Sequence, residues 1–315
     1  MNFTGFFCGV LTSATFGLIP LFTLPLMDKG MTFPSILFYR FFISAVMLGV
    51  FLFVLRRSFQ ITKKELLTLL ALSLFYDGSA VFLFWGYDYL ASGVATTINF
   101  LYPVFVALIM TWFFKEKTSV WTFVAIGLAV AGVALLSLSG GDGGQVSLRG
   151  VFIVLLSGVW YALYIVGVNK SCVREMGALK LTFYVFLFSS LEIFLYTQAR
   201  GIFQLVPDRA SDFNLTMLAL IPTVISNISL VYAIKAIGST ATSVLGAMEP
   251  VTAVAVGVWV FNEPFTVTLL WGLVLIIGAV TLVILAPWAD RGYRAGKFLY
   301  LTRVRGKHRH LVPYE

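Results

Sequence analysis

The sequence predicts an all-α integral membrane protein with ten transmembrane helices arranged as two inverted five-helix repeats. Three observations lead to this fold class. The chain is 59% hydrophobic and only 11% charged, whereas soluble domains are about 45–50% apolar and about 25% charged. Apolar runs of roughly 20 residues, the length that crosses a bilayer, occur ten times. The two halves of the chain also align with each other.

The ten predicted spans follow one another with short connections that leave no room for a soluble domain. Helices fit these runs better than the strands of a β-barrel, which would be about ten residues long and strictly alternating. The expected limits of the spans are 4–26, 33–55, 66–87, 93–114, 120–139, 150–169, 179–198, 213–234, 240–261 and 266–286.

An internal repeat divides the spans into two sets of five. A shift of 147 residues aligns Pro103 with Pro250, Trp112 with Trp259 and Glu116 with Glu263. Such matches are less expected by chance than matches among apolar residues. Because five is odd, the two halves should insert with opposite orientation. We expect a first repeat at 1–142, a second at 146–288 and a basic cytoplasmic tail at 289–315.

The distribution of Lys and Arg predicts that both termini are cytoplasmic. With the N-terminus inside, 17 of the 22 basic residues fall on inner segments and 4 on outer ones, and Arg40 lies within a span. Short cytoplasmic loops carry such an excess of positive charge. The basic tail is typical of a topological anchor beside anionic lipid, and we expect no nucleic-acid binding. The expected location is the inner or plasma membrane, crossed many times.

Two prolines lie near the middle of spans 93–114 and 240–261. Pro103 and Pro250 lack an N–H group and displace the carbonyls four residues before them, those of Asn99 and Gly246. Broken helices at corresponding positions of two inverted repeats indicate a transport site near the bilayer midplane. Both prolines are therefore expected to shape that site.

Two carboxyl groups lie at mid-depth in predicted spans. Placing an ionisable group at the bilayer centre costs about 2.5–3.5 kcal/mol on insertion scales, so such groups usually face a cavity or a partner. Glu249 is the first candidate for proton coupling or for binding a substrate ammonium, and Asp77 is the second. The structural alternatives are a hydrogen bond from Glu249 to the facing broken helix, and one from Asp77 to Ser73 or Tyr76.

Aromatic and amide side chains on four spans are expected to line a substrate pocket. On span 150–169, Trp160, Tyr161 and Tyr164 recur at helical spacing and share a face. Amphipathic rings accept apolar bodies and supply a few hydrogen bonds; the alternatives are helix packing or an interfacial aromatic belt. The expected substrate-binding residues are Tyr76, Asn99, Tyr102, Trp160, Tyr164, Asn227 and Glu249.

Four further charged residues are given structural roles. Arg40 and Glu192 each lie about seven residues, or about 10 Å at 1.5 Å per residue, from the outer end of a span. This matched depth predicts a buried ion pair, and the alternative for Arg40 is to bind a substrate carboxylate. Glu116 and Glu263 end spans 93–114 and 240–261 and are expected to cap the helices that follow them.

Three stretches carry a resemblance to a known family. They are Phe38-Tyr39-Arg40-Phe41, Tyr102-Pro103-Val104 with Trp112-Phe113-Phe114-Lys115-Glu116, and Glu249-Pro250-Val251 with Trp259-Val260-Phe261-Asn262-Glu263. They resemble the ten-helix EamA-type branch of the drug/metabolite transporter superfamily over nearly all of residues 1–287. The resemblance implies small-molecule transport, a cavity lined by spans 1, 3, 4, 6, 8 and 9, and packing of span 5 on span 10. One departure is that Arg40 aligns with Val185 in the second repeat.

The expected function is secondary transport, with export of a small amino acid-like or amphipathic drug-like metabolite by alternating access. Its partners would be the solute, membrane lipid and, in a coupled mechanism, protons. Import is the alternative direction, and a membrane-embedded lipid-modifying enzyme or a non-transporting receptor represents another class. The sequence holds no Gly-x-x-x-x-Gly-Lys-Ser/Thr motif and no His/Cys cluster with metal spacing. We therefore expect no cofactor, metal or enzymatic activity; substrate, coupling ion and monomer or homodimer state stay open.

Overall fold

The computed structural model describes residues 3–115, 120–137, 147–237, 242 and 245–285, and the regular structure within these ranges is helical. Eight helices are long and apolar enough to cross a membrane, and two shorter apolar helices lie at 121–136 and 248–260. Every predicted span therefore has a helical counterpart, which confirms the predicted fold class. Glu116, the linker at 139–144 and the tail at 289–315 lie outside the described residues.

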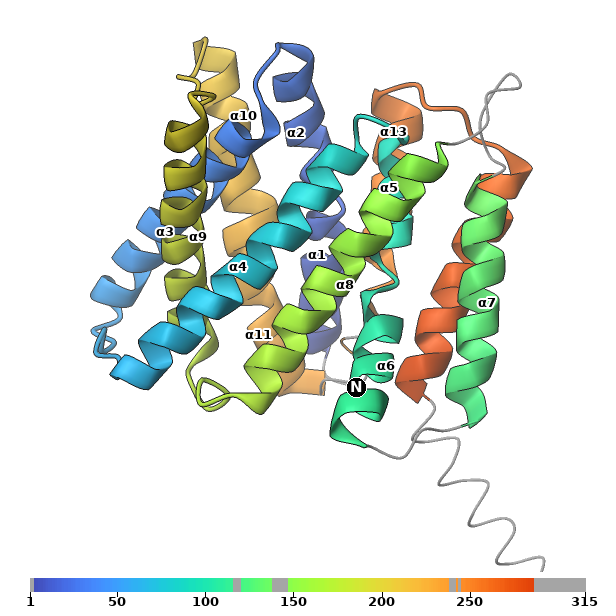
Figure 1. Cartoon of the computed structure of the whole chain (residues 1–315), viewed down its shortest axis with the longest axis horizontal. Coiled ribbons are helices and arrows are strands. Elements are labelled where there is room, and N and C mark those ends of the chain that lie inside the picture. Colours follow the sequence, from blue (N-terminus) through green and yellow to red (C-terminus); the bar gives the residue numbers. More distant parts are fainter. Residues whose placement is uncertain (1–2, 116–119, 138–146, 238–241, 243–244, 286–315) are drawn as a thin grey trace, which may run out of the picture.

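Within the described residues of the first half, seven helices make five spans (Figure 1). The first and fourth spans are each broken into two helices. The elements are α1 (Phe3–Phe16), α2 (Ile19–Asp28), α3 (Phe33–Val54), α4 (Lys63–Gly86), α5 (Ser92–Asn99), α6 (Tyr102–Phe114) and α7 (Val120–Ser137).

The second half repeats this arrangement with a different irregularity in its third span. There a π-helical turn, η2, separates two α-helices. The elements are α8 (Leu148–Lys170), α9 (Ala178–Arg200), α10 (Arg209–Ala219), η2 (Leu220–Ile225), α11 (Ser226–Ile237), α13 (Met248–Val260) and a last helix, Val267–Leu285.

Prolines account for the breaks. Pro20 and Pro103 lie in the first turns of α2 and α6, where a missing N–H group breaks no helical hydrogen bond. Pro222 lies within η2, and Pro250 lies in the first turn of α13. Each break therefore falls in the middle of a span, where the freed backbone groups can face a cavity instead of lipid.

The helices pack in pairs that join the two halves. α3 packs against α9, α4 against α8, α1 against α11 and α5 against α13. In Figure 1, α3, α9 and α10 lie at one end of the molecule and α7 lies at the other, beside the last helix. Each pair joins one element of the first repeat with one of the second, as inverted repeats require.

Small residues allow α7 and the last helix to approach closely. A Cβ atom on Gly132 would lie 2.7 Å from Ile276, and one on Gly272 would lie 2.7 Å from Leu136. Glycines at such crossings let membrane helices pack backbone to backbone. The contact agrees with the packing of span 5 on span 10 that the family resemblance implies.

Glu263 caps a helix, but a different one from the helix we predicted. Its Oε1 accepts hydrogen bonds from the Ser92 amide at 2.6 Å and the Ser92 hydroxyl at 2.7 Å. Its Oε2 accepts from the Gly93 amide at 3.3 Å. The prediction of a cap on the following helix was wrong, because α5 from the other repeat brings an N-terminus without a side-chain cap of its own to this carboxylate.

Candidate functional site

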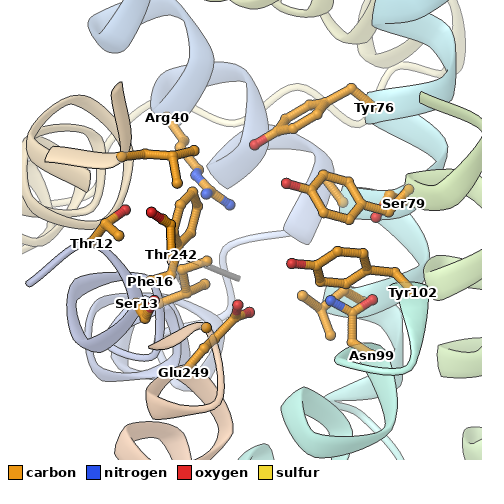
Figure 2. Close-up of a pocket in the computed structure, with 16 residues that line it drawn as sticks. Thr12, Ser13, Phe16, Arg40, Tyr76, Ser79, Asn99, Tyr102, Thr242 and Glu249 are labelled. Carbon is orange, nitrogen blue, oxygen red and sulfur yellow. The ribbon is translucent and has the colours of Figure 1, made fainter. Parts of the chain in front are cut away.

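A cavity of about 170 Å³ lies where the broken helices meet (Figure 2). A single water needs about 10–15 Å³ measured in this way, so the space can hold a small organic molecule. Both repeats contribute to its walls. The first repeat contributes residues from each helix from α1 to α6, and the second contributes residues from α8, α11 and α13. The polar lining residues are Thr12, Ser13, Arg40, Tyr76, Ser79, Asn99, Tyr102, Tyr161, Thr242 and Glu249.

The acidic group of the cavity is Glu249, in the first turn of α13. Its backbone amide donates to the Gly246 carbonyl at 2.9 Å, and its side chain points into the cavity (Figure 2). Gly17, at the break between α1 and α2, allows the close approach, since a Cβ there would lie 2.4 Å from the Glu249 carbonyl oxygen. Within the described part of the chain, no ion pair neutralises this carboxylate.

The positive charge comes from Arg40 on α3, which is only 3% exposed. Its Nε donates to Thr223 Oγ1 at 3.2 Å, and its guanidinium lies 5.6 Å from the Phe41 ring centroid and 5.9 Å from that of Phe84. These contacts fix the guanidinium at the cavity wall (Figure 2). A fixed guanidinium can bind a carboxylate through two parallel hydrogen bonds.

The predicted ion pair between Arg40 and Glu192 is not formed. Glu192 Oε1 instead accepts a hydrogen bond from Ser73 Oγ at 2.8 Å, between α4 and α9. The two residues do lie on packed helices, but their side chains leave those helices in different directions. The π-helical turn η2 brings Thr223 to Arg40, and its hydroxyl in turn donates to the Leu218 carbonyl at 2.9 Å.

Tyrosines form the wall opposite the two charges. The Tyr102 and Tyr161 rings meet edge to face with centroids 4.7 Å apart, and Tyr76 lies 6.1 Å from Tyr161. In Figure 2 the hydroxyls of Tyr76 and Tyr102 point into the cavity. Tyr164 does not line the cavity; its ring lies 5.3 Å from Tyr76 and 5.9 Å from Tyr161, so it supports this wall.

A hydroxyl and an amide fix the floor of the cavity. Ser157 Oγ lies 2.9 Å from Asn99 Oδ1 and 2.7 Å from the Ser79 carbonyl oxygen. Asn99 ends α5 at the break before Pro103, and Ser157 and Ser79 lie on α8 and α4. The three helices are therefore joined at the point where the fourth span is interrupted.

Besides Tyr164, three other sequence-predicted residues lie outside the lining. Trp160 packs on α4, where its ring centroid lies 5.8 Å from that of Phe75. Its ring also lies over Gly78, so close that a Cβ atom on Gly78 would be only 2.6 Å from it. Asn227 Nδ2 donates to the Thr223 carbonyl at 2.6 Å. Asp77 is turned towards α9.

Other lining residues were not among the predicted ones. Tyr161 lies on the predicted aromatic face, one position from Trp160, and its ring lines the cavity. The Trp160 ring instead packs over Gly78. Thr12 and Ser13 line the cavity from α1, and Thr12 Oγ1 also donates to the Ser226 carbonyl at 2.7 Å. A cluster of hydroxyl residues in an otherwise apolar span was the available signal.

Comparison with known proteins gives one consistent family. The EamA-like transporter family matches residues 3–138 and 148–285, which is once in each half. The uncharacterized transporter YetK of Bacillus subtilis is 25% identical over 272 residues, covering 82% of this chain and 80% of the relative. The uncharacterized transporter YvbV of Bacillus subtilis is 30% identical, covering 68% of this chain and 69% of the relative.

A third relative and a solved structure extend this picture. An uncharacterized transporter of Archaeoglobus fulgidus is 25% identical, over 65% of this chain and 72% of its own length. A crystal structure superimposes with a TM-score of 0.62 at 17% identity, covering 92% of this chain and 98% of the other. That structure supports the fold alone. The chain is a multi-pass membrane transporter that belongs to the EamA-like transporter family.

Proposed function

We propose that the protein exports a small zwitterionic, amino acid-like solute across the plasma membrane by alternating access. The observation that carries this proposal is that Arg40 and Glu249 face one cavity from opposite repeats. The carboxylate of the solute would bind the Arg40 guanidinium, and its ammonium group would bind Glu249. The body of the solute would lie against Tyr102 and Tyr161.

The charges of the cavity favour a zwitterion over a simple ion. A charged group taken out of water is expensive unless a partner compensates it. A solute with one carboxylate and one ammonium would compensate both wall charges and bring no excess charge of its own. A neutral, drug-like solute would leave both charges uncompensated, and a bulky lipid would exceed a cavity of about 170 Å³.

The Glu263 contact is the basis for testing export first. Glu263 ties α5 to the region after α13. With both termini in the cytoplasm, as the positive-inside pattern predicts, this contact would lie at the outer face. A cavity closed there would load its solute from the cytoplasm. Alternating access would then require the Glu263 contact to break when the solute leaves on the outer side.

Flux measurements in proteoliposomes test this function. We expect counterflow of a labelled zwitterionic amino acid, and competition only from solutes that keep both charged groups. Amide and decarboxylated analogues of the same amino acid should not compete. Arg40→Gln and Glu249→Gln should each abolish counterflow, while Glu175→Gln, at an exposed loop position, should not.

The same assay separates the rivals. Equal competition by the amide analogue, together with full activity of Arg40→Gln, would contradict the zwitterion proposal. Uptake without release would indicate import. Protein that binds the amino acid but shows no flux in either direction would indicate a receptor.

A further inference from the structure

A second group of buried polar side chains lies between α4 and α9, outside the cavity. Asp77 is 7% exposed, and neither of its carboxylate oxygens has a hydrogen-bond donor. Its neighbours across the interface are the carboxyl of Glu192 and the hydroxyl of Ser189. Ser189 is fully buried, and its hydroxyl also lacks a partner.

Glu192 is only partly satisfied. Its Oε1 accepts from Ser73 Oγ at 2.8 Å, whereas its Oε2 has no donor. Ser73 lies one turn before Asp77 on α4, so one helix presents a hydroxyl and a carboxyl to the same partner. The cluster of Ser73, Asp77, Ser189 and Glu192 thus contains four unsatisfied oxygens, three on the two carboxyl groups and one on the Ser189 hydroxyl.

Among the described residues, no basic side chain contacts Asp77 or Glu192 to compensate their charge. Arg40 on α3 is bonded to Thr223 and faces the cavity. From α8, the titratable side chains nearby are Tyr161 and Tyr164, which pack on Tyr76. α5 brings no titratable side chain, and Tyr232, the tyrosine of α11, is 63% exposed.

We infer that Asp77 and Glu192 form a proton-binding site that holds one proton between the two carboxyl groups. Two ionised carboxylates in contact repel each other and lack hydration at this depth. One shared proton converts the pair into a donor and an acceptor and supplies the missing hydrogen bond. The two carboxyl groups interact across the interface, and the described residues contain no group of three metal-ligating side chains that would favour a metal ion over a proton.

The site is joined to the cavity through one helix. Tyr76, the residue before Asp77, lines the cavity and packs on Phe186 of α9 with ring centroids 5.5 Å apart. Gain or loss of the proton between α4 and α9 would therefore affect the position of the Tyr76 ring, which lines the cavity. The proton site itself is independent of the solute, so it can be tested in full-length protein without any transport assay.

The test measures protonated carboxyl groups by infrared spectroscopy of the full-length protein in nanodiscs, without solute, at neutral pH. We expect Asp77→Asn and Glu192→Gln each to remove the signal of one protonated carboxyl, because the introduced amide donates to the remaining carboxylate. The double variant should lose the same single signal and no more. The control Glu175→Gln should match the wild type.

Several outcomes would overturn the site. Unchanged spectra in the single variants would mean that no proton is bound there. A loss of two signals in the double variant would mean two independent protonated groups. If added sodium removed the signal and raised the unfolding temperature, the site would bind a metal ion and not a proton. Since the two single variants give the same reading, one that folds is sufficient.

Discussion

Removal of the Glu263 carboxylate should loosen the N-terminus of α5. The Ser92 amide and hydroxyl donate to Glu263 at 2.6 and 2.7 Å, and the Gly93 amide donates at 3.3 Å. Ser92 is only 2% exposed, so water would replace these bonds poorly. Hydrogen bonds to charged groups contribute about 1.5–3 kcal/mol, and loss of a helix cap costs about 1 kcal/mol.

Glu263→Ala should therefore weaken this contact by about 2–3 kcal/mol, since the contributions overlap. At about 1.4 kcal/mol for each factor of ten, local opening should become about 30- to 150-fold more frequent. Glu263→Gln should have a smaller effect, because its amide oxygen still accepts from Ser92 while its NH₂ group cannot accept from Gly93.

Hydrogen exchange measured by mass spectrometry in nanodiscs reads this opening at the amides of residues 88–95. Glu65→Ala is the matched control, since Glu65 caps α4 by accepting from the Thr62 amide at 2.6 Å, at an exposed helix end. It should accelerate exchange at the start of α4 only. Exchange at 88–95 that is unchanged in Glu263→Ala, or that is equally accelerated in Glu65→Ala, would refute the assignment of Glu263 as the closing contact.

Four further predictions concern other parts of the molecule. The pKa of Asp208 is held at about 2, mainly by its hydrogen bond from Lys29. The difference in unfolding free energy between wild type and Asp208→Asn should therefore be constant above about pH 4 and should vanish as the pH falls through about 2. Denaturation at a series of pH values measures this difference. Trp160→Ala should lower the unfolding free energy by about 3–5 kcal/mol yet leave solute affinity within threefold; a selective loss of affinity would return this ring to the pocket. Cys172 is exposed and should resist impermeant thiol reagents in intact cells; labelling there would reverse the predicted topology. Glu249→Gln should fold and should show no flux driven by a pH gradient, as expected of a variant that has lost counterflow; wild-type pH-driven flux would exclude Glu249 from both solute binding and coupling.

Helix breaks and isolated charges were the features that the sequence predicted best. A proline inside an apolar run ends a helix for local reasons, and this holds at Pro103 in the structure. A carboxyl at mid-depth has few sites that it can occupy, so Glu249 was expected to face a cavity or a partner and does line one. Both predictions depend on one residue and its distance from the ends of the span.

Predictions that depended on rotation about a helix axis were less successful. Arg40 and Glu192 share a depth, but depth does not fix direction, and η2 supplies Thr223 as the partner of Arg40. Trp160 and Tyr161 differ by one position, and the space above Gly78 decides which ring faces α4. These details arise from contacts between residues about 80 to 180 positions apart, which local patterns do not encode.

The charges of the cavity break the symmetry that the backbone keeps. Arg40 aligns with Val185 and Glu249 aligns with Tyr102, so each repeat contributes one charge of opposite sign instead of a matched pair. A zwitterion bridging them would bind the first repeat through its carboxylate and the second through its ammonium group. Rotation of one repeat against the other changes the distance between these two charges, and the solute binds most tightly where that distance matches its own. The asymmetry would thus give the solute different affinities in the two halves of the transport cycle, which a ligand requires if its binding is to shift a conformational equilibrium.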